Sequence, residues 1–432
     1  MLVAFRFRNF RSFKGDGELT LIASPADKSI SSALLDPTPT GRSKVRLLPA
    51  IAIYGANAAG KTNVLEAISF FSLAIRASQT SWAPREMIQF QTHAGAIDDD
   101  TLSMEAEFFL DGIRYVYGFS AAQYFFEDEW LYAYPKGRKR VVFSRTSSED
   151  GDVKITTGDE FTGASAYIES VKSRVRPNSL FLSAAAQDNH PLCLKLFDYF
   201  DDVLLGTLIE NDESRQTLTS MFADSDAEFK KSIVRFLQLA DKSISDIIVE
   251  PIGKGWDQLS VEKRAGFFNK QRYKVMFVMG EGDDSFYIPF ISQSVGIKKL
   301  YGLISEILVS LTSHRIILFD ELETSIHPHV ARAIVDMFQD SSLNIAGSQL
   351  LFTTHDTNLL DQTLLRRDQI WFVEKDSCCS HLYSLLDFSP RNDADLEKGY
   401  LRGKYGAIPA VSMPPGWLQI TPGVERLLAT NA

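Results

Sequence analysis

Residues 55–62 of the chain have the sequence Gly55-Ala56-Asn57-Ala58-Ala59-Gly60-Lys61-Thr62. The preceding residues 47–54 form an apolar run that predicts a buried parallel strand, and residues 63–73 carry apolar residues at helical spacing. A glycine-rich turn between a strand and a helix, ending in lysine and a hydroxyl residue, is typical of a loop that binds phosphate groups. The sequence therefore predicts an α/β fold with a nucleotide-binding loop.

Each residue type in this loop has a chemical role. The glycines let the backbone amides turn inward around a β-phosphate, and the start of the helix adds positive potential. Lys61 has the length to reach the β- and γ-phosphates, and the Thr62 hydroxyl can ligate Mg²⁺. We expect the nucleotide to contact Gly55, Asn57, Ala58, Ala59, Gly60, Lys61, Thr62 and Asn63.

The composition describes a large globular chain. Its 432 residues are 45% hydrophobic, enough for an extensive core in one or several domains. No apolar run approaches the roughly 18 residues of a membrane span, and residues 1–13 do not form a signal-peptide core. The three cysteines are too few for a disulfide framework and do not form a structural zinc motif. The net charge of −10 disfavours a protein whose whole surface coats nucleic acid. We therefore expect a cytoplasmic protein without a membrane segment.

The first part of the chain predicts a β-layer. Residues 3–13 alternate apolar and basic side chains, which predicts an opening strand. Residues 102–110 and 113–119 alternate around Asp111-Gly112, a strong hairpin signal, and strands are expected at 130–134 and 140–143. These segments together predict an antiparallel layer.

Helices dominate the middle of the chain, and strands return after it. Between residues 161 and 249 the clearest helix is predicted at 227–239, after the capping Asp226. Strands are expected at 258–261 and 273–279, then a long apolar helix at 295–310 and a buried strand at 315–319. The parallel α/β core is therefore expected to resume in the last third of the chain.

A pair of acids follows that buried strand. Asp320 and Glu321 come at its carboxyl end, the edge at which α/β sheets place their ligands. We expect Asp320 to hold Mg²⁺ directly or through water, and Glu321 to act as the general base toward the attacking water. An ordinary acidic turn is the alternative, but the phosphate loop upstream favours the catalytic interpretation.

Histidines follow in the same region. Residues 349–353 predict a second apolar strand that ends ahead of His355, which would face the same sheet edge and orient the water or contact the γ-phosphate. His327 and His329 flank Pro328; a metal pair is conceivable, but a turn after the strand explains them as well, and we favour the turn.

A further anion site is predicted ahead of the acidic strand. Ser294 and Gly296 stand at the start of the helix expected at 295–310, where free amides and the helix dipole attract negative charge. Lys298 or Lys299 would support it. Taken alone, such a start is usually only a helix cap.

Together these motifs resemble the ABC-type ATPases of the SMC, RecF and OLD lineage, in the branch of standalone AAA-family ATPases found in anti-phage systems such as PARIS and Septu. Residues 7–13 match the N-terminal strand of that branch, 55–62 its Walker A motif and 294–299 a divergent signature motif. Residues 318–321 match the Walker B motif, 324–325 the D-loop, His355 the switch histidine and 400–409 the C-terminal ending. The resemblance covers nearly the whole chain.

The resemblance implies an ABC-type P-loop ATPase head, with a mixed or parallel sheet, an antiparallel β-layer and an inserted helical subdomain. Residues 1–145 would form the core lobe with the Walker A motif and β-layer, and residues 146–245 the inserted, mainly helical subdomain. Residues 246–432 would complete the core with the signature, Walker B motif, switch histidine and C-terminal tail.

The resemblance also implies ATP and Mg²⁺ as ligands and a head-to-tail homodimer or larger homo-oligomer. ATP on Lys61 of one subunit would be covered by Ser294 and Gly296 of another, with Lys61, Glu321 and His355 as the catalytic residues. Thr62, Asp320 and the Q-loop residue would hold Mg²⁺. Our candidate for the Q-loop is Gln91, with Gln89 as its rival and a solvated loop residue as the alternative.

Two functions stay open at this point. The first is an ATPase sensor and scaffold of prokaryotic antiviral defence that controls a separate nuclease or toxin, since nothing here resembles the acidic clusters of a TOPRIM nuclease. The second is a DNA-binding RecF- or SMC-like ATPase of DNA repair or chromosome maintenance. Its DNA surface would include Arg6, Arg8, Arg11 and the basic residues of 136–140 and 402–404, although alternating charges are also typical of a solvated face.

Overall fold

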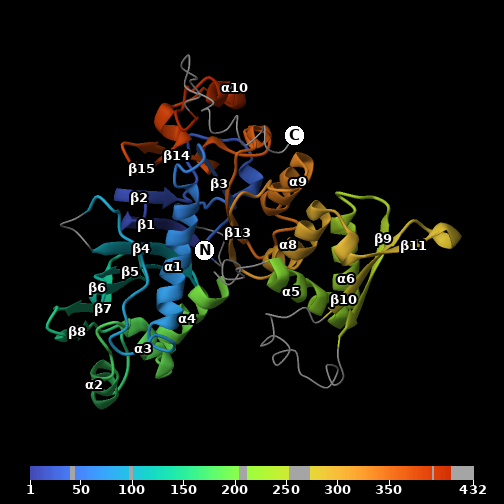
Figure 1. Cartoon of the computed structure of the whole chain (residues 1–432). Helices are drawn as coiled ribbons and strands as arrows, with labels where there is room; N and C mark the ends of the chain where they lie inside the picture. The colour runs from blue at the N-terminus through green and yellow to red at the C-terminus, as the bar shows by residue number, and fades with distance from the viewer. Residues whose placement is uncertain (39–43, 97–100, 204–211, 253–272, 392–393, 410–432) are drawn as a thin grey trace, which may run out of the picture.

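The structure is a computed structural model and describes residues 1–38, 44–96, 101–203, 212–252, 273–391 and 394–409. These residues form a mixed α/β fold with sheets of seven, five and three strands, and helices between and around them (Figure 1). Within the described ranges, no helix has the length and apolar character needed to cross a bilayer.

The seven-stranded sheet is antiparallel and has the order β2-β1-β4-β5-β6-β7-β8. The predicted hairpin at Asp111-Gly112 is confirmed, because both residues take positive φ angles (51° and 74°) between paired strands. The strand expected to run to residue 13 ends earlier, since the chain turns at Arg11 (φ 51°). The strands are β1 (Leu2–Phe10), β2 (Phe13–Thr20), β4 (Leu102–Leu110), β5 (Ile113–Ala121), β6 (Phe126–Tyr134), β7 (Arg140–Ser147) and β8 (Val153–Thr157).

The five-stranded sheet is the centre of the molecule and has the order β12-β13-β3-β14-β15. Its neighbours pair in parallel except β14 and β15, which form an antiparallel hairpin. The strands expected near 47–54, 315–319 and 349–353 are therefore confirmed as neighbours in one sheet. The strands are β3 (Ala50–Tyr54), β12 (Ile316–Phe319), β13 (Gln349–Thr353), β14 (Ile370–Asp376) and β15 (Cys379–Ser384).

Helix α1 (Lys61–Ala77) lies between the two larger sheets and contacts β1 of one and β13 of the other (Figure 1). The alternation of β3 explains this packing. Ile51 and Ile53 point into the core shared with α1, whereas Ala50, Ala52 and Tyr54 join a second core on the opposite face. That second core contains α8 (Val295–Thr312) and α9 (Pro328–Gln339). Both faces of the central sheet are thus covered, as a parallel sheet requires.

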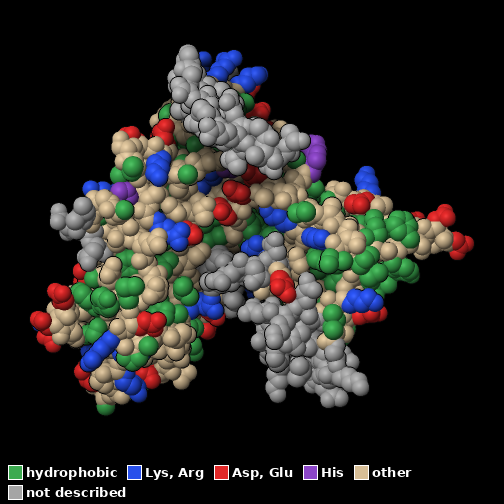
Figure 2. Space-filling view, viewed as in Figure 1, with side chains coloured by type: hydrophobic (Ala, Val, Ile, Leu, Met, Phe, Trp, Pro, Cys, Tyr) green, Lys and Arg blue, Asp and Glu red, His purple; other side chains and the backbone are tan. Residues whose placement is uncertain are grey.

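A three-stranded sheet forms an arm beside α8, with the order β11-β10-β9. Its strands are β9 (Ile244–Pro251), β10 (Tyr273–Met279) and β11 (Phe286–Pro289), packed with α5 (Asp212–Ser225) and α6 (Ala227–Leu237). The predicted cap is confirmed, since the Asp226 carboxylate accepts hydrogen bonds from the first turn of α6. Acidic side chains gather at the far end of the arm (Figure 2), where Glu281, Asp283 and Asp284 are exposed. The strand predicted at 258–261 lies outside the described residues.

The helices of the middle segment pack in two places. Helices α2 (Ser165–Ser173), α3 (Phe181–Gln187) and α4 (Pro191–Val203) bury their apolar faces with α1 and the seven-stranded sheet, whereas α5 and α6 belong to the core of the arm. Glu129, a buried carboxylate on β6, fixes α3 by accepting hydrogen bonds from the backbone N–H groups of Phe181 (2.6 Å) and Leu182 (2.9 Å). A short helix, α10 (Leu396–Leu401), follows the hairpin of β14 and β15. The division of the chain at residues 145 and 245 remains a prediction.

The core between α5 and α8 contains a carboxyl group that makes stability depend on pH. Glu306 is 3% exposed, and burial raises its pKa to about 7 despite Arg215, whose Nε lies 3.3 Å from Oε1. A carboxyl whose pKa rises on folding destabilises the folded state progressively as pH climbs from its unfolded pKa to about 7.

We therefore expect the free energy of unfolding of Glu306→Gln, relative to the wild type, to increase from pH 5 to pH 8. The increase should be on the order of 2–3 kcal/mol, because one pKa unit corresponds to about 1.4 kcal/mol. Urea unfolding at both pH values measures it, with Glu169→Gln on the surface of α2 as the control. A difference that stays constant or shrinks with pH would contradict the raised pKa.

Candidate functional site

The loop of residues 55–60 joins β3 to α1, and packing requires glycine at both of its ends. A Cβ atom on Gly55 would lie 2.3 Å from the backbone oxygen of Val373 on β14. A Cβ atom on Gly60 would lie 2.6 Å from the Oγ atoms of both Ser12 and Ser380, and its φ of 108° also favours glycine. Neighbouring atoms from two other parts of the chain therefore exclude any side chain at Gly55 and Gly60.

Two serines that contact each other, with 2.7 Å between their hydroxyl oxygens, support the loop. Asn63 on α1 donates a hydrogen bond to the Ser12 hydroxyl (2.6 Å), in the turn between β1 and β2. Ser380 on β15 donates to the backbone oxygen of Ala59 (2.5 Å), and its own N–H donates to the Ser12 backbone oxygen (2.8 Å). These hydrogen bonds constrain the loop without a ligand, which lowers the entropic cost of binding.

Lys61 is buried beneath the loop, with 6% of its surface exposed. Its ammonium group donates to the backbone oxygens of Gly55 (3.0 Å) and Ala56 (3.2 Å), and it lies 2.9 Å from His355 Nε2. Burial lowers the pKa of Lys61, while Glu321 and Asp320 oppose that shift. The structure therefore brings Lys61 and His355 together across 294 residues of sequence, as the motif order predicts.

Thr62 and Asp320 also meet at this edge of the central sheet. The Thr62 hydroxyl lies 2.9 Å from Asp320 Oδ2 and 3.1 Å from Oδ1. Thr353, at the end of β13, donates from its hydroxyl to Asp320 Oδ1 (2.6 Å). Asp320 follows β12, Thr353 ends β13, and Thr62 lies in the first turn of α1 after β3, so the carboxyl ends of three parallel strands gather these oxygen atoms in one place.

Glu321 adopts a left-handed backbone conformation, with φ of 48°. Two contacts stabilise it: its N–H donates to the Thr353 hydroxyl (2.7 Å), and its Oε2 accepts from the Thr324 hydroxyl (3.0 Å). Lys299 on α8 reaches its backbone oxygen (3.4 Å). Non-glycine residues in this conformation are uncommon and concentrate at functional sites, so the geometry agrees with a reactive position for this carboxylate.

His355 completes the group at the end of β13. Burial, followed by the Lys61 ammonium, lowers the pKa of His355, so the ring is neutral at neutral pH. Because an ammonium group can only donate, Nε2 is the acceptor of the Lys61 contact. The His355 backbone N–H donates to Glu323 Oε1 (2.6 Å), which places this strand end relative to the acidic turn.

The donor set fits a magnesium nucleotide. The third partner of the Lys61 ammonium group is a neutral imidazole. A negatively charged phosphate oxygen can replace this imidazole and bind the ammonium group more strongly. The Thr62 hydroxyl and Asp320 carboxylate are the hard oxygen ligands that Mg²⁺ prefers, and Mg²⁺ is usually held by one or two protein groups with substrate phosphates. The backbone around Gly60 supplies the close approach that phosphate needs.

Comparison with known families agrees with this geometry. A family model described as "AAA domain, putative AbiEii toxin, Type IV TA system" matches residues 50–361. The chain belongs to this family. The match begins at β3 and includes the phosphate loop, the arm, the acidic turn and His355. A search of curated proteins found no significant relative.

Solved structures similar to this AAA domain include three SMC heads. An SMC head bound to the C-winged helix domain of ScpA shares 13% identity at a TM-score of 0.42, covering 89% of this chain and 97% of the other. The SMC head domain from Thermotoga maritima shares 11% at a TM-score of 0.39, covering 89% and 98%. A head with an extended coiled coil, bound to the C-terminal domain of ScpA derived from Pyrococcus furiosus, shares 13% at 0.38, covering 93% and 98%. The function proposed below does not rest on these likenesses.

The residues of the expected anion site contact other parts of the AAA domain than its phosphate loop. Ser294 caps α8 by accepting from the Ile297 N–H (3.2 Å), and a Cβ atom on Gly296 would lie 2.6 Å from the Ser325 backbone oxygen. No hydrogen bond between described residues joins Ser294 or Gly296 to the loop. Gly296 faces Ser325, in the turn that follows β12, instead.

The candidates Gln91 and Gln89 are not brought to the metal site. Gln91 is exposed, and its backbone oxygen accepts from the Arg11 N–H (2.8 Å). Gln89 Nε2 lies 3.5 Å from the Met87 backbone oxygen. Among the described residues, neither side chain contacts Thr62 or Asp320, so a Q-loop role for either residue stays a prediction.

The paired histidines belong to a helix start. His327 is the N-cap of α9, and its Nδ1 accepts from the His329 N–H (3.2 Å). No group of three or more metal-ligating side chains is present in the described part of the AAA domain. The sequence favoured a turn at this place, and the local geometry is that of a capped helix with Pro328 in its first turn.

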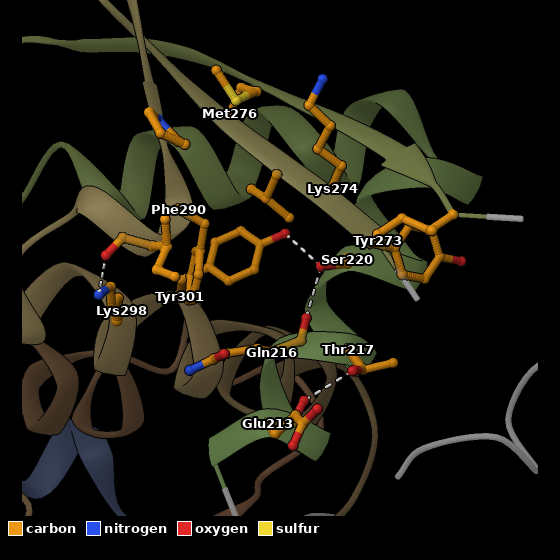
Figure 3. A pocket seen from close by; sticks show the side chains of 14 residues that line it. Glu213, Gln216, Thr217, Ser220, Tyr273, Lys274, Met276, Phe290, Lys298 and Tyr301 are labelled. Carbon is orange, nitrogen blue, oxygen red and sulfur yellow. Dashed lines mark hydrogen bonds between the residues drawn. The ribbon is translucent and has the colours of Figure 1, made fainter. Parts of the chain in front are cut away.

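A cavity of about 490 Å³ lies between α5, α8 and the arm of the AAA domain, away from the phosphate loop (Figure 3). Aromatic and apolar side chains dominate its lining, and Ser220 shares a hydrogen bond with the Tyr301 hydroxyl (2.9 Å). Lys298 reaches across its edge to the Ile291 backbone oxygen (2.6 Å). The phosphate chemistry is therefore separate from this apolar cavity.

The sequence did not indicate a role for four residues of the site: Ser12, Glu323, Thr353 and Ser380. Each acts through a hydrogen bond to a segment far away in the sequence, which a local pattern does not reveal. Ser12 stands within the quoted N-terminal segment and Glu323 within the acidic turn, but no spacing rule assigns either one a partner. Thr353 could have been found, because a hydroxyl at the end of a strand beside paired acids is well placed to bond them.

Proposed function

We propose that the chain binds ATP at this site and hydrolyses it. The observation that carries this proposal is the convergence of Lys61, Thr62, Asp320, Glu321 and His355, from the ends of β3, β12 and β13, at one edge of the central sheet. The membership in a family of AAA domains supports it as well. Such an edge is where open α/β sheets bind their ligands.

In this proposal the residues act in a simple order. Lys61 exchanges its contact with His355 for oxygens of the β- and γ-phosphates, while Asn57 to Thr62 present backbone amides. Thr62 and Asp320 hold Mg²⁺, which when bound neutralises charge on the phosphate oxygens. Glu321 accepts a proton from the water that attacks the γ-phosphorus, and the bond to the β-phosphate oxygen breaks to give ADP and phosphate. His355, released from Lys61, contacts the γ-phosphate side of the site.

The proposed active assembly contains two copies arranged head to tail. Ser294 and Gly296 of one copy would cover the nucleotide on Lys61 of the other. The exposure of Ser294 and Val295 supports this arrangement, because both are accessible to a second copy. ATP would then favour the assembled state, and hydrolysis would release it.

We propose, as its biological role, a sensor and scaffold of prokaryotic antiviral defence that controls a separate nuclease or toxin. The family description, which names a putative toxin of a toxin–antitoxin system, supports a link to toxic effectors. A second candidate is a DNA-binding ATPase of repair or chromosome maintenance. The turn between β6 and β7 favours it, because Lys136 and Arg138 are exposed there and form no ion pair with the described residues.

The N-terminal arginines offer less support to the DNA-binding candidate. Arg6 lies between Glu18 and Glu105, at 2.9 and 3.1 Å, and Arg11 pairs with Glu66. These cations already have carboxylate partners, so releasing them to bind phosphate would break existing ion pairs.

The first test is mass photometry of the chain expressed with the products of its neighbouring genes, with and without ATP. A stable complex with a neighbour, tightened or loosened by ATP, is the result expected for defence. A complex that contains only copies of this chain and retains duplex DNA in a salt-sensitive manner with ATP would favour the DNA-binding role. Lys136→Glu should then weaken DNA binding, which tests the exposed turn between β6 and β7 as the DNA contact.

A further inference from the structure

Glu323 joins two strand ends of the site. It lies three residues after Asp320, in the turn that follows β12, and its Oε1 accepts a hydrogen bond of 2.6 Å from the His355 N–H after β13. Two further hydrogen bonds join the same segments, from the N–H groups of Glu321 and Leu322 to the hydroxyl (2.7 Å) and backbone oxygen (3.1 Å) of Thr353. Glu323 is thus the outermost link between the acidic turn and the histidine.

The three carboxylates of the turn have different partners. Asp320 contacts the hydroxyls of Thr62 and Thr353, and Glu321 accepts from the hydroxyl of Thr324. Glu323 is the carboxylate that contacts the His355 backbone, and of the three it has the strongest charge effect on the His355 ring. Glu323 therefore contacts the histidine, whereas Asp320 and Glu321 are the residues proposed to act on the metal and the attacking water.

The second oxygen of Glu323 is unusual. Oε2 is buried and has no hydrogen-bond partner among the described residues. A buried, unpartnered carboxylate oxygen is costly, so packing alone does not explain a glutamate at this position. The charge remains next to the Lys61–His355 contact, where it favours the cation that phosphate must meet.

We propose that Glu323 is a positioning residue that holds His355 over Lys61, so that the imidazole occupies the place of a phosphate oxygen until the nucleotide enters. The expected effect on catalysis rests on the proposed ATPase function. The contacts of His355 with Glu323 and Lys61 exist without nucleotide. Glu323 touches neither the nucleotide nor the attacking water in this scheme, and it acts through the backbone of His355.

The first arm of the test needs no activity. The ring signals of His355 are followed by NMR in protein labelled at histidine Cε1, and His355→Gln identifies them among the seven histidines. Glu323→Ala should move the His355 signals, whereas Glu323→Gln, which keeps a carbonyl acceptor, should move them less. Glu397→Gln is the control, because Glu397 accepts from the nearby Thr357 hydroxyl (2.7 Å) and has no bond to His355. Unmoved His355 signals in a folded Glu323→Ala chain would overturn the inference.

The second arm separates this inference from the proposed function. In ATP hydrolysis, Glu323→Ala should lower kcat on the order of ten- to a hundredfold with little change in KM, since small errors of position slow chemistry more than binding. Glu323→Gln should recover most of the loss, and a Gln variant as slow as Ala would contradict a role through the hydrogen bond. If the wild type itself hydrolyses no ATP, the proposed function fails, while the NMR arm still decides the placement of His355.

Discussion

Lys61→Ala is expected to lose ATP affinity on the order of a hundredfold, because the ammonium group supplies charge-assisted hydrogen bonds to phosphate worth about 3 kcal/mol together. The group is already desolvated: it is buried, and two carbonyl oxygens at 3.0 and 3.2 Å aim it toward the interior of the loop. Binding therefore gains from its charge without removing much water. Fluorescence anisotropy with labelled ATP and Mg²⁺ measures the loss.

Two controls make this result specific to phosphate. Lys136→Ala removes an exposed lysine from the turn between β6 and β7 and should leave the affinity unchanged. A thermal melt shows whether Lys61→Ala still folds, since the carbonyl oxygens of Gly55 and Ala56 lose their donor. A folded Lys61→Ala chain with wild-type affinity would remove the basis of the proposed function.

Glu321→Gln should bind ATP like the wild type but hydrolyse it more slowly, by on the order of 10²- to 10⁴-fold, the range typical of losing a general base. The substitution is nearly isosteric, and the amide oxygen can still accept the hydrogen bond from Thr324. The left-handed backbone at this position, supported by Thr353, should also persist. Only the ability to take up a proton is lost.

Because hydrolysis is the proposed release step, this variant should accumulate as an ATP-bound dimer or larger assembly. Mass photometry with saturating ATP and Mg²⁺ reports the species, and Glu169→Gln on the surface of α2 is the matched control. A Glu321→Gln chain that stays monomeric under these conditions would argue against the head-to-tail assembly. Normal hydrolysis by this chain would argue against Glu321 as the base.

The sequence predicts the central part of this site well, for a physical reason. Buried parallel strands are continuous apolar runs, and ligand residues stand where each run ends, so β3, β12 and β13 locate Lys61, Asp320 and His355 directly. Local turn chemistry likewise predicts the hairpin at Asp111-Gly112. Their partners in space follow from the rule that parallel strands present their carboxyl ends at one edge.

Residues that act through distant contacts could not be found in this way. Glu323 and Ser380 look like ordinary turn and strand residues until β13 and the phosphate loop are placed beside them. The first strand was predicted too long because Arg11 and Ser12 continue the alternation, whereas the positive φ of Arg11 turns the chain. Periodicity also does not show which sheet a helix covers, so α2 to α4 and α5 to α6 could not be assigned to their different cores.

The bracing of Gly60 links the two larger sheets mechanically. Ser12 belongs to the turn of the seven-stranded sheet and Ser380 to the hairpin of the central sheet, and both hydroxyls lie against the same glycine. The two serines also contact each other, with 2.7 Å between their hydroxyl oxygens, so a shift of one sheet against the other would disturb this contact beside the loop. A partner bound to the seven-stranded sheet would therefore have a route to the phosphate loop through Ser12, without contacting the loop itself.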